Sequence, residues 1–208
     1  MPAHWTIGKK LILSFLGIAF IILLSMLYFK STIDAIRIKG PLYQQIIDSK
    51  DLIADILPPP AFIIESYLCA MEVATVEEDA GKREQLLGRL KELAEGTGYF
   101  QERIKFWETT LTDANIRSVF LQEATQQARS FYTTALGPFA SAVRGNQMET
   151  ARQIFHQQLK PSYVRHRQAI DKVVTLANDA FSAQESRAQQ LLGKKMLTMA
   201  LIAVALVT

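Results

Sequence analysis

Seven side chains able to bind a polar ligand are spread over the middle of this 208-residue chain. They are Glu65, Tyr67, Tyr99, Arg103, Arg129, Tyr163 and His166. An arginine guanidinium presents a planar fork of N–H donors, which matches a carboxylate or another planar anion. Arginine among tyrosines therefore predicts a binding site for a small-molecule ligand, with an organic anion as the expected class.

The histidines and the cysteine do not predict a metal site. His156 and His166 are too far apart in sequence, because two histidines that share a metal on one helix usually lie at i and i+4. His166 is expected to be a core histidine, with an axial haem ligand as the alternative. The one cysteine, Cys69, cannot form an internal disulfide and is expected to pack as a small buried hydrophobe.

The sequence contains no pattern that indicates catalysis. There is no nucleophile–base motif, no phosphate-binding glycine loop and no metal-ligand signature. The formal net charge of +3 comes from mixed signs without a basic block, so nucleic acid is not an expected partner. We therefore expect a binding protein that is not an enzyme and needs no cofactor.

The elements that position these side chains are predicted to be helices. Between residues 30 and 195 there is no period-two strand pattern and no hairpin dipeptide. Apolar residues recur every three or four positions instead, which keeps them on one face of a helix. Three such stripes are Leu86, Leu90, Leu93, Thr97, Phe100, Ile104 and Trp107; Ile116, Phe120, Ala124, Ala128, Phe131, Ala135, Phe139 and Ala142; and Tyr163, His166, Ile170, Val173, Ala177 and Ala180.

Cap residues predict where four helices begin and end. Thr75-Val-Glu-Glu78 has the pattern of a capping box for the second helix, and Thr112 or Asp113 would cap the third. Asn146-Gln-Met-Glu149, after Gly145, would close the third helix and open the fourth. The predicted helices are 31–74, 76–108, 113–144 and 147–195. Their short connections predict an all-α, antiparallel up-down-up-down four-helix bundle.

Helix breakers fall at one predicted level of this bundle. Pro58-Pro59-Pro60 must bend or restart the first helix, Gly96 and Gly98 loosen the second, and Lys160-Pro161 interrupts the fourth. Counting rises of about 1.5 Å per residue places these breaks and the small stripe residues Ala124 to Ala128 at a similar height. Broken backbone and small side chains predict a pocket there, lined by the seven candidates. The alternative is that the kinks only bend the bundle and the tyrosines are packing residues.

Two apolar runs flank the predicted bundle. Residues 11–29 carry no charge and, as a helix, are long enough to cross a hydrocarbon layer of about 30 Å. No small-x-small cleavage site follows, so we expect a retained anchor and not a cleaved signal peptide. The predicted domains are a leader at 1–10, a transmembrane helix at 11–29, a sensor bundle at 30–195 and the truncated start of a second transmembrane helix at 196–208.

Three segments resemble bacterial transmembrane chemoreceptors, the methyl-accepting chemotaxis proteins. The opening Trp5–Phe20 resembles their start, in which a short basic leader runs directly into the first span. Leu159–Asp171 is similar to the fourth helix of their four-helix-bundle ligand-binding domains, and Ile56–Leu68 to a segment of some of these receptors. Sensor kinases and membrane-bound cyclases share such domains.

The resemblance implies a dimeric sensor in the inner membrane, with the N-terminus in the cytoplasm and the bundle in the periplasm. Ligand binding would shift the last helix along the membrane normal and so signal for chemotaxis. The familiar amino-acid receptors use arginines on the first helix, whereas this first helix has only Arg37, so no binding residue is transferred. The alternatives are the ectodomain of a sensor kinase or cyclase, a structural module that docks a periplasmic protein, and a haem or redox sensor using His166 or Cys69.

Overall fold

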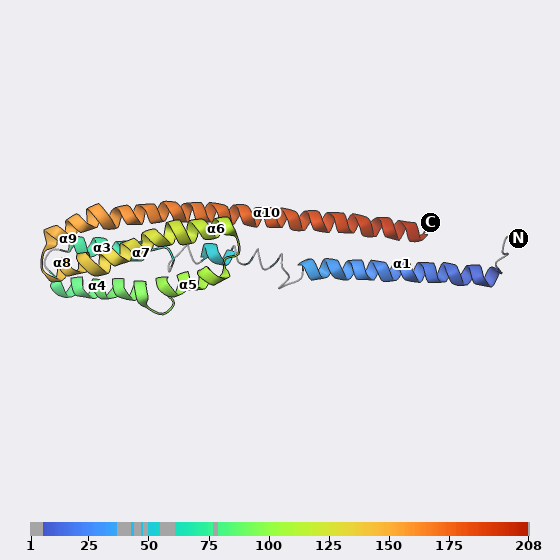
Figure 1. The fold of residues 1–208 in the computed structure, drawn as a ribbon, viewed down its shortest axis with the longest axis horizontal. Helices are drawn as coiled ribbons and strands as arrows, with labels where there is room; N and C mark the ends of the chain where they lie inside the picture. The colour runs from blue at the N-terminus through green and yellow to red at the C-terminus, as the bar shows by residue number, and fades with distance from the viewer. Residues whose placement is uncertain are drawn as a thin grey trace. The chain divides into compact units, whose positions relative to one another are not determined.

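The computed structural model describes residues 6–36, 43, 47, 50–54, 61–76 and 79–207. In these ranges every regular element is a helix and no strand occurs (Figure 1), which confirms the predicted all-α class. The chain divides into two compact units. One consists of Met1–Ile47 with Phe181–Thr208, and the other of Asp48–Ala180.

From α3 onward the described helices follow one another with short connections. They are α1 (Ile7–Ile36), α3 (Ile64–Thr75), α4 (Ala80–Glu95), α5 (Phe100–Thr110), α6 (Ala114–Ser118), η1 (Val119–Ala124), α7 (Thr125–Thr134), η2 (Ala135–Phe139), α8 (Ala140–Arg144), α9 (Met148–Ile154), η3 (Phe155–Leu159) and α10 (Lys160–Val207). The three η elements are π-helical turns that continue directly into the α-helices on either side. Residues 114–144 and 148–207 are therefore two unbroken helical runs.

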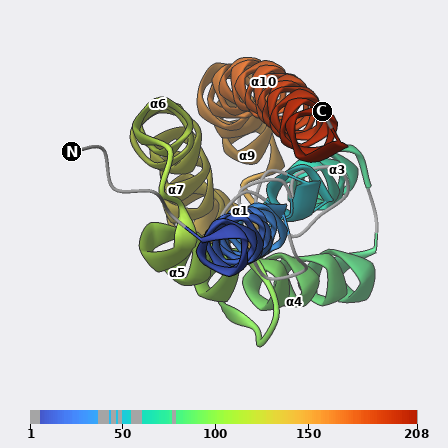
Figure 2. The ribbon, with the colours of Figure 1, turned by 90° about the vertical axis from the view of Figure 1, so that its right-hand side faces the viewer.

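The unit Asp48–Ala180 is held together by one apolar core. Helix α3 packs against α4, α9 and η3, and α4 also packs against α8 and η2. Seen end-on in Figure 2, α3, α4, α7 and α9 surround this shared interior. All eight stripe residues predicted for 113–144 are buried in it, so the apolar periodicity of that helix is confirmed.

The second predicted helix begins later than its capping box indicated. Thr75 is the last residue of α3, and its hydroxyl donates to the carbonyl oxygens of Met71 and Glu72 at 3.1 and 3.0 Å. Helix α4 is capped instead by Asp79, whose carboxylate accepts from the backbone N–H of Lys82 at 2.8 Å. The capping-box prediction at Thr75 was wrong, because the threonine hydroxyl bonds back into the preceding helix.

The two later turns differ in how well cap chemistry predicted them. Asp113 caps α6, with Oδ1 accepting from the backbone N–H groups of Asn115 and Ile116 at 2.9 and 3.0 Å, as predicted. Asn146 was predicted to cap the fourth helix, but the N-cap is Gln147. Asn146 has a φ of 54° and ends the preceding helix, a backbone conformation that asparagine tolerates better than most residues.

The prolines of the last two helical runs do not break them. Pro161 was predicted to interrupt the fourth helix, but it is the second residue of α10 and follows the π-helical turn η3. Pro138 lies inside a second π-helical turn, η2. A π turn shifts the hydrogen-bond pattern to i→i+5, which accommodates a residue without an N–H donor. The predicted triple-proline break at 58–60 lies outside the described residues.

Among the described residues of the unit Met1–Ile47 with Phe181–Thr208, one helix is long and apolar enough to cross a membrane. This stretch, Ile7–Asp34, has a mean hydropathy of 2.6 over its best window, and that window has no buried residue. Lys195 on α10 contacts α1, with Nζ 3.4 Å from Ser31 Oγ and 4.8 Å from the centre of the Tyr28 ring. Residues 196–207 continue α10. The second transmembrane span and the domain limits stay predictions.

Candidate functional site

A break between α4 and α5 creates the surface on which a ligand could sit. Helix α4 ends at Glu95, and Gly96 leaves it in an extended conformation. A Cβ at Gly96 would lie 2.6 Å from the carbonyl oxygen of Glu92, so only glycine fits without a shift. Gly98 has a φ of 80°, and its N–H donates to Glu102 Oε2 at 2.6 Å. The second predicted helix is therefore two helices joined by a tight turn.

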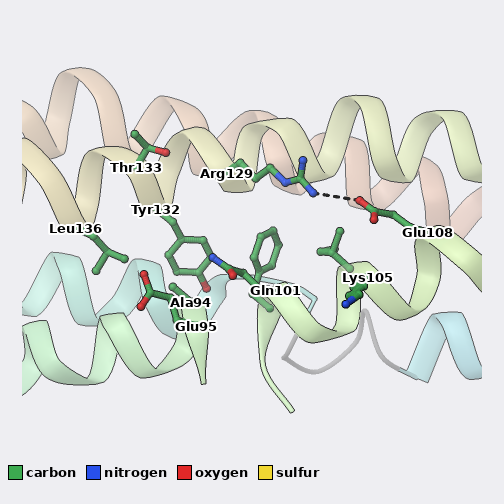
Figure 3. Close-up of a pocket in the computed structure, with 11 residues that line it drawn as sticks. Ala94, Glu95, Gln101, Lys105, Glu108, Arg129, Tyr132, Thr133 and Leu136 are labelled. Atoms are coloured by element: carbon green, nitrogen blue, oxygen red, sulfur yellow. Dashed lines mark hydrogen bonds and ion pairs between the residues drawn. The ribbon is translucent and has the colours of Figure 1, made fainter. Parts of the chain in front are cut away.

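An open groove of about 670 Å³ lies beside this turn, between α4 and α5 on one side and α7 and η2 on the other (Figure 3). Its volume falls in the range of small-molecule sites, roughly 300–1,000 Å³. The residues that line it are Ala94, Glu95, Phe100, Gln101, Ile104, Lys105, Glu108, Arg129, Tyr132, Thr133 and Leu136. We call this surface the groove.

The floor of the groove is apolar and firmly held. Phe100 and Tyr132 are buried, and their ring centres lie 5.0 Å apart at an angle of 49°. The Tyr132 hydroxyl shares a buried 2.7 Å hydrogen bond with Ser66 Oγ on α3. Burial raises the pKa of Tyr132, so its hydroxyl stays neutral. A ligand would meet a preformed aromatic surface there.

The rim of the groove carries four charged side chains. Arg129 and Glu108 form an ion pair at 3.1 Å, and their side chains are 63% and 43% exposed. Lys105 and Glu95 are exposed and form no ion pair with any described residue. The groove therefore offers positively charged donors and negatively charged acceptors around an apolar floor. This arrangement suits binding, and it places no nucleophile next to a base.

Only one of the seven sequence-predicted candidates lines the groove. That residue is Arg129. Glu65 and Tyr99 meet at a different place through Arg89, a residue that the sequence analysis did not single out. Arg89 donates to Glu65 Oε1 from Nε at 3.0 Å and from Nη2 at 2.7 Å, and to the Tyr99 hydroxyl at 3.1 Å. Glu92 accepts from Arg89 at 2.8 Å as well, which makes Arg89 the centre of a polar cluster.

Two of the predicted tyrosines lie against each other. The rings of Tyr67 on α3 and Tyr163 on α10 are stacked, with centres 4.1 Å apart and planes 10° from parallel. Phe62 and Phe155 extend this stack at 6.0 Å from Tyr163 and 5.6 Å from Tyr67. Burial raises the pKa of Tyr163. These tyrosines pack the core, which is the alternative that the sequence analysis left open.

The last two candidates also occupy packed positions. The Arg103 guanidinium lies 4.5 Å from the centre of the Phe106 ring and 6.0 Å from that of Trp107. His166 is 1% exposed, and its Nδ1 lies 2.9 Å from the carbonyl oxygen of Ala124. Burial lowers the pKa of His166 to about 4. Neither side chain is among those that line the groove.

The remaining chemistry-bearing groups are few in the described part of the chain. Cys69 is buried, and burial followed by the charge of Glu65 raises the pKa of its thiol, which disfavours the reactive thiolate. Within the described ranges no three histidine, cysteine, aspartate or glutamate side chains are grouped so that they could hold a metal ion.

Sequence reasoning missed most of the groove for an identifiable reason. Phe100 and Ile104 were assigned to the apolar stripe, as core residues, and Tyr132 follows the stripe residue Phe131. The signal that could have found them was the pair of glycines at 96 and 98. Read as a complete break, the pair predicts an opening beside the residues that flank it on the second and third helices.

Comparisons of the chain with protein-family models, with curated proteins and with solved structures gave no match.

Proposed function

We propose that this chain is the sensor region of a transmembrane signal-transduction receptor of the chemoreceptor type, and that it senses a small molecule. The observation that carries the proposal is the continuity of α10. This single helix of 48 residues runs from Lys160 to Val207, so its first part belongs to the apolar core and its last part to the apolar C-terminal stretch. A packed helix moves as a unit, and therefore α10 can carry a displacement from one to the other.

The proposed architecture is an antiparallel up-down-up-down four-helix bundle. Its four helical segments are the one that ends in α3, then α4 with α5, then α6 to α8, and finally α9 with α10. The short connections at 111–113 and 145–147 support a reversal of direction between successive segments. In this proposal the first and last segments continue into transmembrane helices. The length and hydropathy of Ile7–Asp34 support the first of these anchors.

The proposed placement is the inner membrane of a bacterium, with the bundle in the periplasm and the receptor acting as a homodimer. The resemblance to chemoreceptors described above supports this orientation and oligomeric state. A sensor kinase or cyclase ectodomain would use the same architecture with a different output domain.

The groove is the proposed ligand site. Its volume, its aromatic floor and its exposed charged rim support this proposal, because they match the usual features of small-molecule sites. Helix α7 forms one wall of the groove and also packs against the π-helical turn η3, which leads into α10. A ligand that favours one position of α7 would therefore bias η3 and α10, and the response is a shift between two populations. The π turn is a suitable hinge, because such turns interrupt the regular hydrogen-bond ladder.

The experiment that tests this function is a thermal-stability screen of the full chain in lipid nanodiscs against a diverse library of small molecules. We expect at least one compound to raise the melting temperature, because a ligand that binds only the folded state stabilises it. Leu136→Trp fills the groove and should abolish that rise. Leu191→Trp, at an exposed position that does not line the groove, is the matched control and should keep it.

Two results would contradict the proposal. One is a library without any stabilising compound, together with a periplasmic protein that co-purifies with the chain, which would favour a docking module. The other concerns topology. An exposed cysteine introduced as Gln126→Cys should react with a membrane-impermeant maleimide from the periplasmic side, whereas the wild-type chain, with only the buried Cys69, should not. Labelling only after cell lysis would overturn the periplasmic placement.

A further inference from the structure

The charges of the groove are distributed along its length. Figure 3 shows Glu95 toward one end, on the same side of the view as Leu136, and Lys105 toward the other end. Glu95 and Lys105 are exposed and have no ion-pair partner in the part of the chain that the structure describes. Each end of the groove therefore presents a charge that a ligand of opposite sign could neutralise.

The basic end of the groove has spare donor capacity. Arg129 gives one hydrogen bond to Glu108, from Nη2, while a guanidinium carries five N–H donors in a rigid fork. Lys105, on the neighbouring helix α5, adds a second cation to the same end. Arg129 and Lys105 together outweigh the single carboxylate of Glu108. This end therefore suits a carboxylate, which the fork of Arg129 can hold and the positive charge of Lys105 attracts.

The distance between the two ends follows from helix geometry. Arg129 and Leu136 both line the groove, and they are the first and last lining residues on the helical run 114–144. Seven helical residues span about 10 Å at 1.5 Å per residue. The floor between the ends carries the packed rings of Phe100 and Tyr132, and the polar side chains of Gln101 and Thr133 also line the groove. A ligand that reaches both charges must therefore be elongated and apolar in its middle.

We propose that the ligand of the groove is an elongated zwitterion, with a carboxylate bound by Arg129 and Lys105, an ammonium bound by Glu95, and an apolar body over Phe100 and Tyr132. This inference rests on the proposed function, because it names the ligand class of the same site. It excludes compact ligands, which reach only one end, and simple organic anions, which leave Glu95 without a partner.

Three probe molecules of the same length distinguish the contributions of the two ends of the groove to binding. ω-Aminooctanoate carries both charges, ω-hydroxyoctanoate carries only the carboxylate, and ω-aminooctanamide carries only the ammonium. Titration calorimetry with the full chain in lipid nanodiscs should show that ω-aminooctanoate binds about tenfold more tightly than either single-charge probe, because a charge-assisted hydrogen bond contributes about that factor. The short zwitterion ω-aminobutanoate should bind no better than the single-charge probes.

Three variants assign the ends to residues. Glu95→Gln should weaken ω-aminooctanoate about tenfold and leave ω-hydroxyoctanoate unchanged. Lys105→Met and Arg129→Met should weaken both carboxylate probes and leave ω-aminooctanamide unchanged. Glu185→Gln, at an exposed carboxylate that does not line the groove, is the matched control. Circular dichroism of each ligand-free variant checks that the helices are retained.

Equal affinity for all three probes, or no binding of any of them, would overturn the zwitterion. An equal effect of Glu95→Gln on both carboxylate probes would also overturn it, because the substitution would then act on the fold. A wrong ligand class can be distinguished from a wrong proposed function. If library compounds still stabilise the chain and Leu136→Trp abolishes their effect, the groove is the ligand site and only the ligand class is wrong.

Discussion

His166 Nδ1 lies 2.9 Å from the carbonyl oxygen of Ala124, and this contact determines the tautomer of the buried imidazole. The carbonyl can only accept, so Nδ1 carries the hydrogen. The other ring nitrogen, Nε2, is buried and has no partner among the described residues. Protonation would place a cation and an unpaired donor in the core. The core therefore contains a group that is neutral when the chain is folded and takes up a proton more readily when the chain is unfolded.

The free energy of unfolding should fall as the solution is acidified. Burial lowers the pKa of His166 to about 4, whereas an unfolded histidine takes up its proton near pH 6.5. Between these values the unfolded chain binds more protons, so the contribution of His166 is present above about pH 6.5 and is lost toward pH 4. The loss from this residue is about 3 kcal/mol. Urea unfolding of the full chain in detergent, followed by circular dichroism across this range, measures it.

A variant pair tests whether His166 causes that loss. His166→Gln should flatten the pH dependence, whereas His156→Gln, at an exposed position of the same helical run, should keep the wild-type slope. An unchanged slope in His166→Gln would assign the acid sensitivity to other groups.

Gly96→Ala should destabilise the chain by about 1–3 kcal/mol, because the added methyl would meet the Glu92 carbonyl oxygen at 2.6 Å and force the turn to shift. Gly88→Ala is the matched control on the same helix. A Cβ there meets nothing within 4 Å, so it should stabilise α4 by about 0.5–1 kcal/mol. Chemical unfolding of both variants measures the contrast. Equal effects at the two positions would mean that the turn at Gly96 is not as tight as described.

Arg89→Met should cost about 1 kcal/mol and make stability less dependent on salt. The Arg89 and Glu65 side chains are 34% and 40% exposed, so solvent screens the pair and limits its contribution. Arg89→Lys should not restore the loss, because an ammonium cannot reproduce the fork that contacts Glu65 and Tyr99. A double-mutant cycle of Arg89→Met with Glu65→Gln should give a coupling of about 0.5–1 kcal/mol. No measurable coupling would show that the pair only positions the helices.

Tyr132→Phe should destabilise the chain by about 1–2 kcal/mol, because it leaves the buried Ser66 hydroxyl without its 2.7 Å partner. Adding Ser66→Ala removes the unpaired hydroxyl and should recover part of that loss. Thermal unfolding of the two variants measures the recovery. A double variant that is less stable than Tyr132→Phe would show that the Ser66 hydroxyl has a second role in the core.

Regularities that involve near neighbours in the chain were predictable from the sequence. The apolar spacing of residues 116–142 indicated a buried helix face, and every stripe residue there is buried. Asp113 was recognised as a cap because its carboxylate bonds to N–H groups only two and three residues away. The length and apolar character of the first helix were also predictable from the sequence. These features depend on local geometry, and the amino-acid order specifies local geometry directly.

Contacts between distant residues could not be read in this way. Arg89 joins Glu65 and Tyr99 because of how α3 meets α4 and how the turn at Gly96 aims Tyr99. The π turn that contains Pro138 and the one that precedes Pro161 also lie against distant helices, η2 against α4 and α9, and η3 against α3 and α7. Residue types limit which side chains can bind a ligand, but the positions at which helix faces meet select Arg129 for the groove and Arg89 for the cluster with Glu65 and Tyr99. Those positions are set by packing summed over the whole core, which no short segment of sequence contains.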